Sequence, residues 1–199
     1  MLNFITQIMN SLGYLGVVLL MILENVFPPL PSELIMPLAG FVSTQGKLSF
    51  AGVAIAGMTG SVLGALPFYY LGKALGTERL KAWADKHGKW LALSGDDIGK
   101  ADQWFDQHGD KTVLIGRLVP GIRSLVSIPA GVSGMPLPKF LLYSAIGTGV
   151  WATALAYAGV LLGKNYSKVE QYIEPVSWVV MGALVLAFGV TVIRRRKAS

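Results

Sequence analysis

Long uncharged runs alternate with short polar connections along this chain of 199 residues. Three runs are long enough as helices, at about 1.5 Å per residue, to cross roughly 30 Å of hydrocarbon. They cover residues 48–72, 140–163 and 175–193. Their length and lack of charge predict three transmembrane helices.

Two further apolar stretches are too short to cross a bilayer. Residues 11–23 and 34–46 would each form a helix of about 20 Å. The segment that joins them carries Glu24, Glu33 and three prolines as helix breaks, namely Pro28, Pro29 and Pro31. Half-length helices around such a break predict a re-entrant hairpin. Protein or a wet cavity must surround the break, because lipid cannot bond its open backbone groups.

The second half of the chain repeats this design. Pro29 and Gly40 have counterparts 91 residues later, and the second hairpin carries breaks at Pro120 and Pro129. One span separates the two hairpins, so the second enters from the opposite side and the repeat is inverted. We therefore predict one membrane domain over residues 1–199. Its parts are repeat halves at about 11–76 and 109–167, a linker at 77–108, and a helix at 175–193 with a basic tail at 194–199.

Composition agrees with an all-α membrane protein, since 53% of the residues are hydrophobic and only 14% are charged. Most cations lie in the middle loop between Lys73 and Lys111 and in the tail, which the positive-inside rule places in the cytoplasm. They are Lys73, Arg79, Lys81, Lys86, Lys89, Lys100, Lys111, Arg194, Arg195, Arg196 and Lys197. The polar linker, with its tryptophans, predicts amphipathic helices at the membrane surface, the second capped by Asp96 or Asp97.

The ionisable residues of the two hairpins are segregated by sign. Glu24 and Glu33 belong to the first hairpin, and Arg117 and Arg123 belong to the second. Charges at membrane depth cost roughly 2.5–3.5 kcal/mol each on insertion scales, so we expect them to face one another or a wet cavity. One interpretation is a set of ion pairs that only lock the hairpins together. The other is a site where the arginines bind an anionic head group and the glutamates exchange protons.

Other chemistry has little support in the sequence. The chain has no cysteine, and it contains no HExxH, GxSxG or Walker motif. His87 and His108 lie in the polar linker, where solvated side chains are the usual finding. The basic tail directly follows an apolar run, as topology anchors do. We therefore predict no enzyme activity, no metal, no cofactor and no nucleic-acid partner, and the N-terminus lacks the pattern of a signal peptide.

At these residues the sequence resembles the DedA family, also called the SNARE-associated or VTT-domain family. The resemblance covers roughly residues 10–165 and rests on ENVFPPLPSE from Glu24, GSVLG from Gly60, WFDQHG from Trp104 and GRLVPGIR from Gly116. It implies two opposed re-entrant hairpins among transmembrane helices, lipid translocation in a bacterial inner membrane and a link to the proton-motive force. It also implies that Glu24, Glu33, Arg117 and Arg123 are essential. Many members carry an Asp where this chain has Ala65, which weakens the expectation of ion coupling.

These inferences converge on a lipid transporter that moves undecaprenyl phosphate, or a similar anionic lipid carrier, toward the cytoplasmic leaflet. Arg117, Arg123, Glu24 and Glu33 would bind the substrate, with Glu24 and Glu33 as candidates for proton coupling. Two alternatives stay open: a phospholipid flippase or scramblase of broader choice, and a proton-coupled exporter of small cations or drugs. The expected partners are a polyprenyl phosphate or phospholipid, protons and, as a homodimer, a second copy of the chain.

Overall fold

Helices form all the regular structure in the part of the chain that can be described. The computed structural model describes residues 2–26, 32–87, 95–109, 111–119 and 123–163, without a strand among them. The helices are α1 (Leu2–Leu12), α2 (Tyr14–Val26), α3 (Ser32–Ser43), α4 (Phe50–His87), α5 (Gly95–His108), α6 (Lys111–Arg117), α7 (Ser127–Val132) and α8 (Leu137–Leu162). The third predicted span and the basic tail lie outside the described residues.

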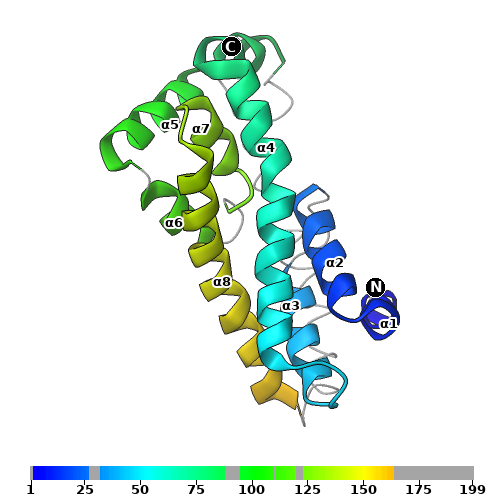
Figure 1. Ribbon diagram of the computed structural model, residues 1–199. Helices are drawn as coiled ribbons and strands as arrows, with labels where there is room; N and C mark the ends of the chain where they lie inside the picture. Colours follow the sequence, from blue (N-terminus) through cyan, green and yellow to red (C-terminus); the bar gives the residue numbers. More distant parts are fainter. Residues whose placement is uncertain (1, 27–31, 88–94, 110, 120–122, 164–199) are drawn as a thin grey trace, which may run out of the picture.

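Among the described residues, two helices are long and apolar enough to cross a membrane. They are Phe50–Ala82 of α4, with 33 residues, and α8, with 26 residues, and they agree with two of the three predicted spans. Helices α1 and α2 lie on one side of α4, and α5, α6 and α7 lie on the other (Figure 1). Each group has its own buried apolar cluster, and both clusters include residues of α4 and α8.

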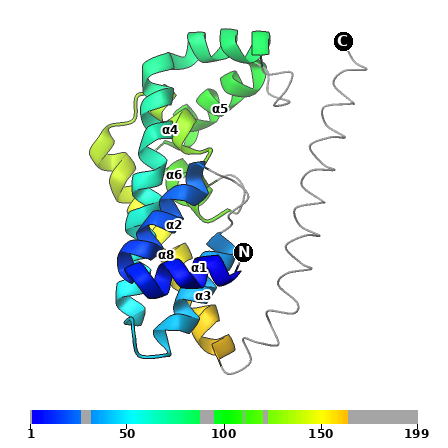
Figure 2. The same ribbon diagram turned by 90° about the vertical axis from the view of Figure 1, so that its right-hand side faces the viewer.

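Helix α4 bends sharply where its apolar part ends. Gly76 has φ 65° and ψ 172°, which is not a helical conformation. Because side chains disfavour such backbone angles, glycine is the residue that permits the bend. Beyond it the helix turns away from the direction of its first part (Figure 2). The polar linker was predicted to begin at this point, at residue 77.

The short helices correspond to the halves of the predicted hairpins. Helices α2 and α3 nearly coincide with the apolar stretches at 11–23 and 34–46, whereas α6 and α7 are shorter. The sequence predicted that Pro129 would break a helix. In the structure, Pro129 is instead the third residue of α7. A proline is tolerated there because the first turn needs no intrahelical N–H donor. The other predicted breaks, Pro28, Pro29, Pro31 and Pro120, lie outside the described residues.

The start of α5 is stabilised differently from the sequence prediction. Asp96 and Asp97 lie inside the first turn of α5 and not at its N-cap, so the predicted capping role is wrong. Instead the N–H of Gly95 donates a hydrogen bond of 2.7 Å to Oδ1 of Asp85. This acceptor comes from the end of α4, so the bond ties the two surface helices together.

Helices α3 and α8 pack with their backbones in contact. A methyl group at Gly40 would collide with the carbonyl oxygen of Ala156, and one at Gly159 would collide with that of Pro37. Because only glycine leaves room for such an approach, these positions determine how closely the two helices lie.

The same contact recurs between α7 and α4. A methyl group at Gly131 would meet the carbonyl oxygen of Tyr69, and one at Gly72 would meet that of Ile128. The residues on α7 follow their counterparts on α3 by 91 positions, but those on α8 follow their counterparts on α4 by 87. The offset predicted from the sequence therefore applies to the short helices. For the long helices the offset is four positions smaller, about one helical turn. Two positions arise because α7 ends two residues early relative to α3, and two because the connection at 133–136 is two residues shorter than that at 44–49.

We expect Gly40→Ala and Gly131→Ala each to lower the free energy of unfolding by about 1–3 kcal/mol, because the added methyl group overpacks a backbone contact. Thermal unfolding of the detergent-solubilised protein measures the effect. Gly163→Ala is the matched control, since its methyl group would find the nearest atom at 3.7 Å. Equal melting temperatures for Gly40→Ala and Gly163→Ala would contradict the close approach.

Candidate functional site

The end of α2 contacts the turn that precedes α7. The carboxylate of Glu24 forms an ion pair with the guanidinium of Arg123, and these side chains are only 6% and 9% exposed. Next to this pair, the hydroxyl of Ser124 donates a hydrogen bond of 3.0 Å to Oδ1 of Asn25. Two adjacent residues of the first half are therefore bonded to two adjacent residues of the second half.

The carboxylate of Glu24 is only partly satisfied. Oε1 faces Arg123, whereas Oε2 is buried and has no hydrogen-bond partner among the described residues. Nδ2 of the neighbouring Asn25 donates to the carbonyl of Met21 at 3.0 Å and not to this oxygen. A buried carboxylate oxygen without a donor is costly, so Oε2 is an unsatisfied acceptor in the described part of this pair.

Arg117, the last residue of α6, is 1% exposed and is surrounded by neutral acceptors. Nη1 donates to the carbonyl of Arg123 at 2.6 Å, and Nη2 donates to Oγ of Ser127 at 2.9 Å. Oγ of Ser144 accepts from Nε at 3.3 Å and from Nη2 at 3.2 Å. The guanidinium carbon lies 5.5 Å from the centre of the Phe140 ring. Within the described chain no carboxylate pairs with Arg117.

Glu24, Arg117 and Arg123 together form what we call the arginine cluster. One anion faces two cations, so the described part of the cluster has an excess of one positive charge. Buried charge without a counter-ion is expensive, and an anion that entered would offset this cost. The arrangement can therefore hold an anionic group, provided that Arg123 or Arg117 turns a donor toward it.

Among the described residues, Glu33 does not form a second ion pair beside that of Glu24 with Arg123, although the sequence had suggested that both glutamates could pair with the arginines. It lies in the first turn of α3, is half-buried, and makes no ion pair with the described residues. The hydrogen bonds of Arg117 go to two serines and a backbone carbonyl instead. The sequence placed all four charges near each other, but it could not show which of them would pair.

Four polar residues of the site escaped the sequence analysis: Asn25, Ser124, Ser127 and Ser144. Serine and asparagine have no characteristic spacing, and Asn25 and Ser124 matter only because the two halves meet. Ser144 did carry a signal, since a hydroxyl inside an otherwise apolar span is a candidate for a hydrogen bond between helices.

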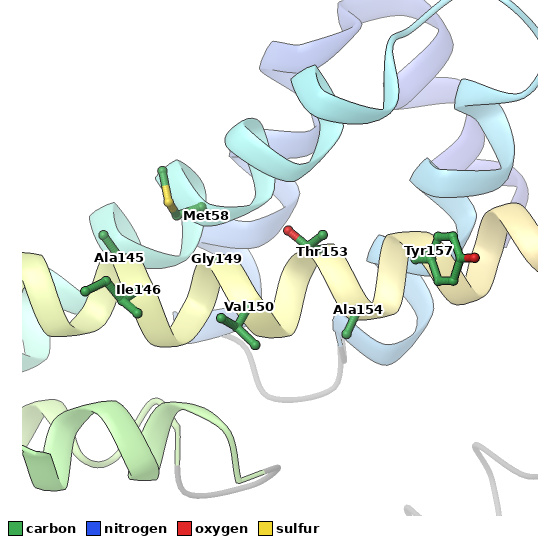
Figure 3. Close-up of a pocket in the computed structure, with 8 residues that line it drawn as sticks. All are labelled: Met58, Ala145, Ile146, Gly149, Val150, Thr153, Ala154 and Tyr157. Atoms are coloured by element: carbon green, nitrogen blue, oxygen red, sulfur yellow. The ribbon is translucent and has the colours of Figure 1, made fainter.

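A separate shallow groove of about 640 Å³ lies along α8 beside Met58 of α4. Its lining is almost wholly apolar, with Ile146 and Val150 on α8 pointing away from α4 (Figure 3). Thr153 and Tyr157 supply its only hydroxyls. None of the described residues that line the groove is charged.

Comparison with known proteins adds the following findings. The sequence model of the VTT domain matches residues 30–161, which include Glu33, Arg117 and Arg123 but begin after Glu24. "Undecaprenyl phosphate transporter A" of Staphylococcus aureus (strain NCTC 8325 / PS 47) is 34% identical over 198 residues, which is 98% of each chain. The protein of the same name from Bacillus subtilis (strain 168) is 28% identical over 194 residues, 96% of this chain and 92% of the relative.

A protein of Lactococcus lactis subsp. lactis (strain IL1403) is 43% identical over 189 residues, 94% of this chain and 88% of the relative, and is named "Alkaline phosphatase-like protein". Other relatives are named as membrane proteins. No solved structure matches the chain. These relatives, together with the two long apolar helices, show that this chain is a membrane protein.

Proposed function

Since the chain belongs to the VTT-domain (DedA) family, we propose that it is a membrane transporter that moves a lipid phosphate across the bilayer. The proposed cargo is undecaprenyl phosphate or a similar polyprenyl phosphate, and the proposed direction is toward the cytoplasmic leaflet of the cell membrane. Two relatives named as undecaprenyl phosphate transporters, which this chain matches over nearly its whole length, support this substrate class.

The observation that carries the proposal is the excess positive charge of the arginine cluster. A phosphate head group would supply the missing anion, and guanidinium groups bind phosphate oxygens with two parallel hydrogen bonds. Arg123 would exchange its partner, pairing with Glu24 in the empty protein and with phosphate in the loaded one. Arg117 is the second guanidinium of the site, and the prenyl chain remains in the lipid.

The proposed transport path follows the internal repeat. Helices α2 and α3 would form one re-entrant hairpin and α6 and α7 the other, entering from opposite sides, with residues 77–108 and the C-terminal tail in the cytoplasm. The crossed contacts of α3 with α8 and of α7 with α4 support two equivalent halves. Rocking of one half against the other would expose the cluster to each side in turn, as in other transporters built from inverted repeats.

Proton coupling would use Glu24 or Glu33, and the free Oε2 of Glu24 favours Glu24. We expect an imposed pH gradient to accelerate lipid phosphate transport by the native chain and to have no effect on Glu24→Gln, which retains the shape of the side chain without its proton exchange. Transport in vesicles with acidic and neutral exteriors measures the response. A response that is lost in Glu33→Gln and kept in Glu24→Gln would instead assign the role to Glu33.

Lipid mass spectrometry on the purified protein tests the substrate class. The native chain, extracted in mild detergent, is expected to retain a polyprenyl phosphate, and Arg123→Ala is expected to lose it. The matched control is Lys81→Ala, which removes a cation from the surface part of α4, where Lys81 pairs with Glu78. Retention of the same neutral or zwitterionic lipids by all three proteins, without a lipid phosphate, would contradict the proposal.

A further inference from the structure

We infer that Ser127 and Ser144 are positioning residues that orient the Arg117 guanidinium and, through it, the turn that carries Arg123. The inference rests on the proposed function, because it explains how the two arginines are presented to a phosphate. Neither serine belongs to the charged set predicted from the sequence.

The geometry ties three helices to one side chain. Arg117 comes from α6, Ser127 begins α7 and Ser144 lies on α8. Both serines are fully buried, and their hydroxyl oxygens accept three of the four hydrogen bonds of the guanidinium. The fourth bond, from Nη1 to the carbonyl of Arg123, fixes the backbone of the residue that pairs with Glu24. A change in the orientation of Arg117 would therefore move Arg123 as well.

The neutral character of these acceptors is important for the charge of the site. A carboxylate at either position would satisfy the same donors, but it would also cancel the positive charge of Arg117. A hydroxyl group accepts the hydrogen bonds and leaves the charge in place. The serines thus allow a buried arginine to be held rigidly while the cluster keeps its attraction for an anion.

Gly147, one turn after Ser144 on α8, provides the space for this arrangement. A Cβ atom at Gly147 would lie 2.6 Å from Cβ of Arg117 and 3.0 Å from the carbonyl oxygen of Leu114. Distances this short require α6 to shift, so Gly147→Ala should displace Arg117 without removing any hydrogen-bonding group. Gly149→Ala is the matched control, because its methyl group would meet only the flexible side chain of Met58 at 3.3 Å.

Transport kinetics test the inference. The probe is a polyprenyl phosphate with a labelled head group in phosphatidylcholine vesicles, and excess external phosphatase releases the label from molecules that reach the outer leaflet. We expect Ser127→Ala, Ser144→Ala and Gly147→Ala each to raise the half-saturating mole fraction of lipid about tenfold, the factor expected for one lost hydrogen bond to a charged group. The maximal rate should change less than about twofold. Thr148→Val and Gly149→Ala should resemble the native chain. Thr148 is also buried on α8, but its hydroxyl donates to the Ser144 carbonyl at 2.7 Å and not to Arg117.

An unchanged half-saturating mole fraction in the serine variants, or an equal rise in Thr148→Val, would overturn the inference. So would a fall in the maximal rate alone, in proportion to lost folded protein, because that is the result of a purely structural role. If the native chain moves no lipid phosphate at all, the proposed function fails, and the positioning role is then decided by spectroscopy.

That second measurement uses the NMR signals of arginine Nε–H groups in the full chain, labelled with ¹⁵N at arginine and kept in detergent. The signal that disappears in Arg117→Lys is assigned to Arg117. We expect it to be protected from exchange with water in the native chain, and to shift and exchange at least about tenfold faster in Ser144→Ala but not in Thr148→Val, because Ser144 accepts from Nε. Exchange at the native rate in Ser144→Ala would overturn the positioning role, whatever the outcome of the transport assay.

Discussion

Arg123→Ala is expected to abolish lipid phosphate transport and to lower the free energy of unfolding by about 3–5 kcal/mol, the usual cost of leaving one partner of a buried ion pair alone. Arg123 and Glu24 are almost fully buried, and Oε2 of Glu24 has no donor in the described part of the chain. Without Arg123 the carboxylate would have no charged partner among the described residues. Chemical unfolding and transport are measured on the same preparation.

A double variant separates the structural and functional roles of this pair. Glu24→Gln/Arg123→Ala removes both charges, so we expect it to recover most of the lost stability while transport stays absent. If the double variant regained transport together with stability, the pair would only lock the two halves to each other. Neither variant changes Ser124 or Asn25, whose side chains are hydrogen-bonded next to the pair, so the comparison is confined to the two charges.

Arg117→Lys is expected to reduce transport by about two orders of magnitude although the charge is conserved. An ammonium group is a compact donor without the planar fork of a guanidinium, so it cannot reach Ser127, Ser144 and the Arg123 carbonyl at once. It also lacks the flat surface that Arg117 presents to the Phe140 ring.

The transport rate and the melting temperature of Arg117→Lys are compared with those of Lys111→Arg. That control exchanges the same two residue types at the exposed start of α6 and should behave like the native chain. Full transport by Arg117→Lys would show that charge alone is sufficient, and the argument from paired hydrogen bonds would be wrong.

Much of the fold could be predicted because apolar length is the main constraint on a membrane chain. The stretches at 11–23 and 34–46 became α2 and α3, and the change to polar composition at residue 77 coincides with the bend at Gly76. Helix α1 was not predicted, since residues 2–12 are amphipathic and too short to span. Ile5 and Met9 on one face of it are fully buried in the core.

The sequence could predict which charged residues form the site, but not which of them would bond to one another. Segregation of glutamates and arginines between the hairpins correctly indicated that the two halves face one another, as the pair of Glu24 with Arg123 shows. Which carboxylate pairs with which guanidinium depends on the turn at 123–126 and on packing across α6, α7 and α8. That information is spread over residues far apart in the sequence, so no local pattern reports it.

Ala65 stands where many members of the family carry an aspartate, and the packing around this position explains the difference. Ala65 is fully buried in an apolar cluster with Tyr69 and Phe140. The rings of Tyr69 and Phe140 are stacked, with their centroids 4.5 Å apart. An aspartate at this position would place a charge in this apolar cluster, which is costly. Because Ala65 has no ionisable group, the proton coupling that we propose would use Glu24 or Glu33.

The central claim is that the arginine cluster moves a lipid by its phosphate. Its most direct test compares two lipids that differ only in the head group, a labelled polyprenyl phosphate and the corresponding polyprenol, in vesicles that contain the native chain or Arg123→Ala. We expect the native chain to accelerate movement of the phosphate at least about a hundredfold more than that of the alcohol, and Arg123→Ala to accelerate neither. Equal acceleration of both lipids by both proteins would contradict the account.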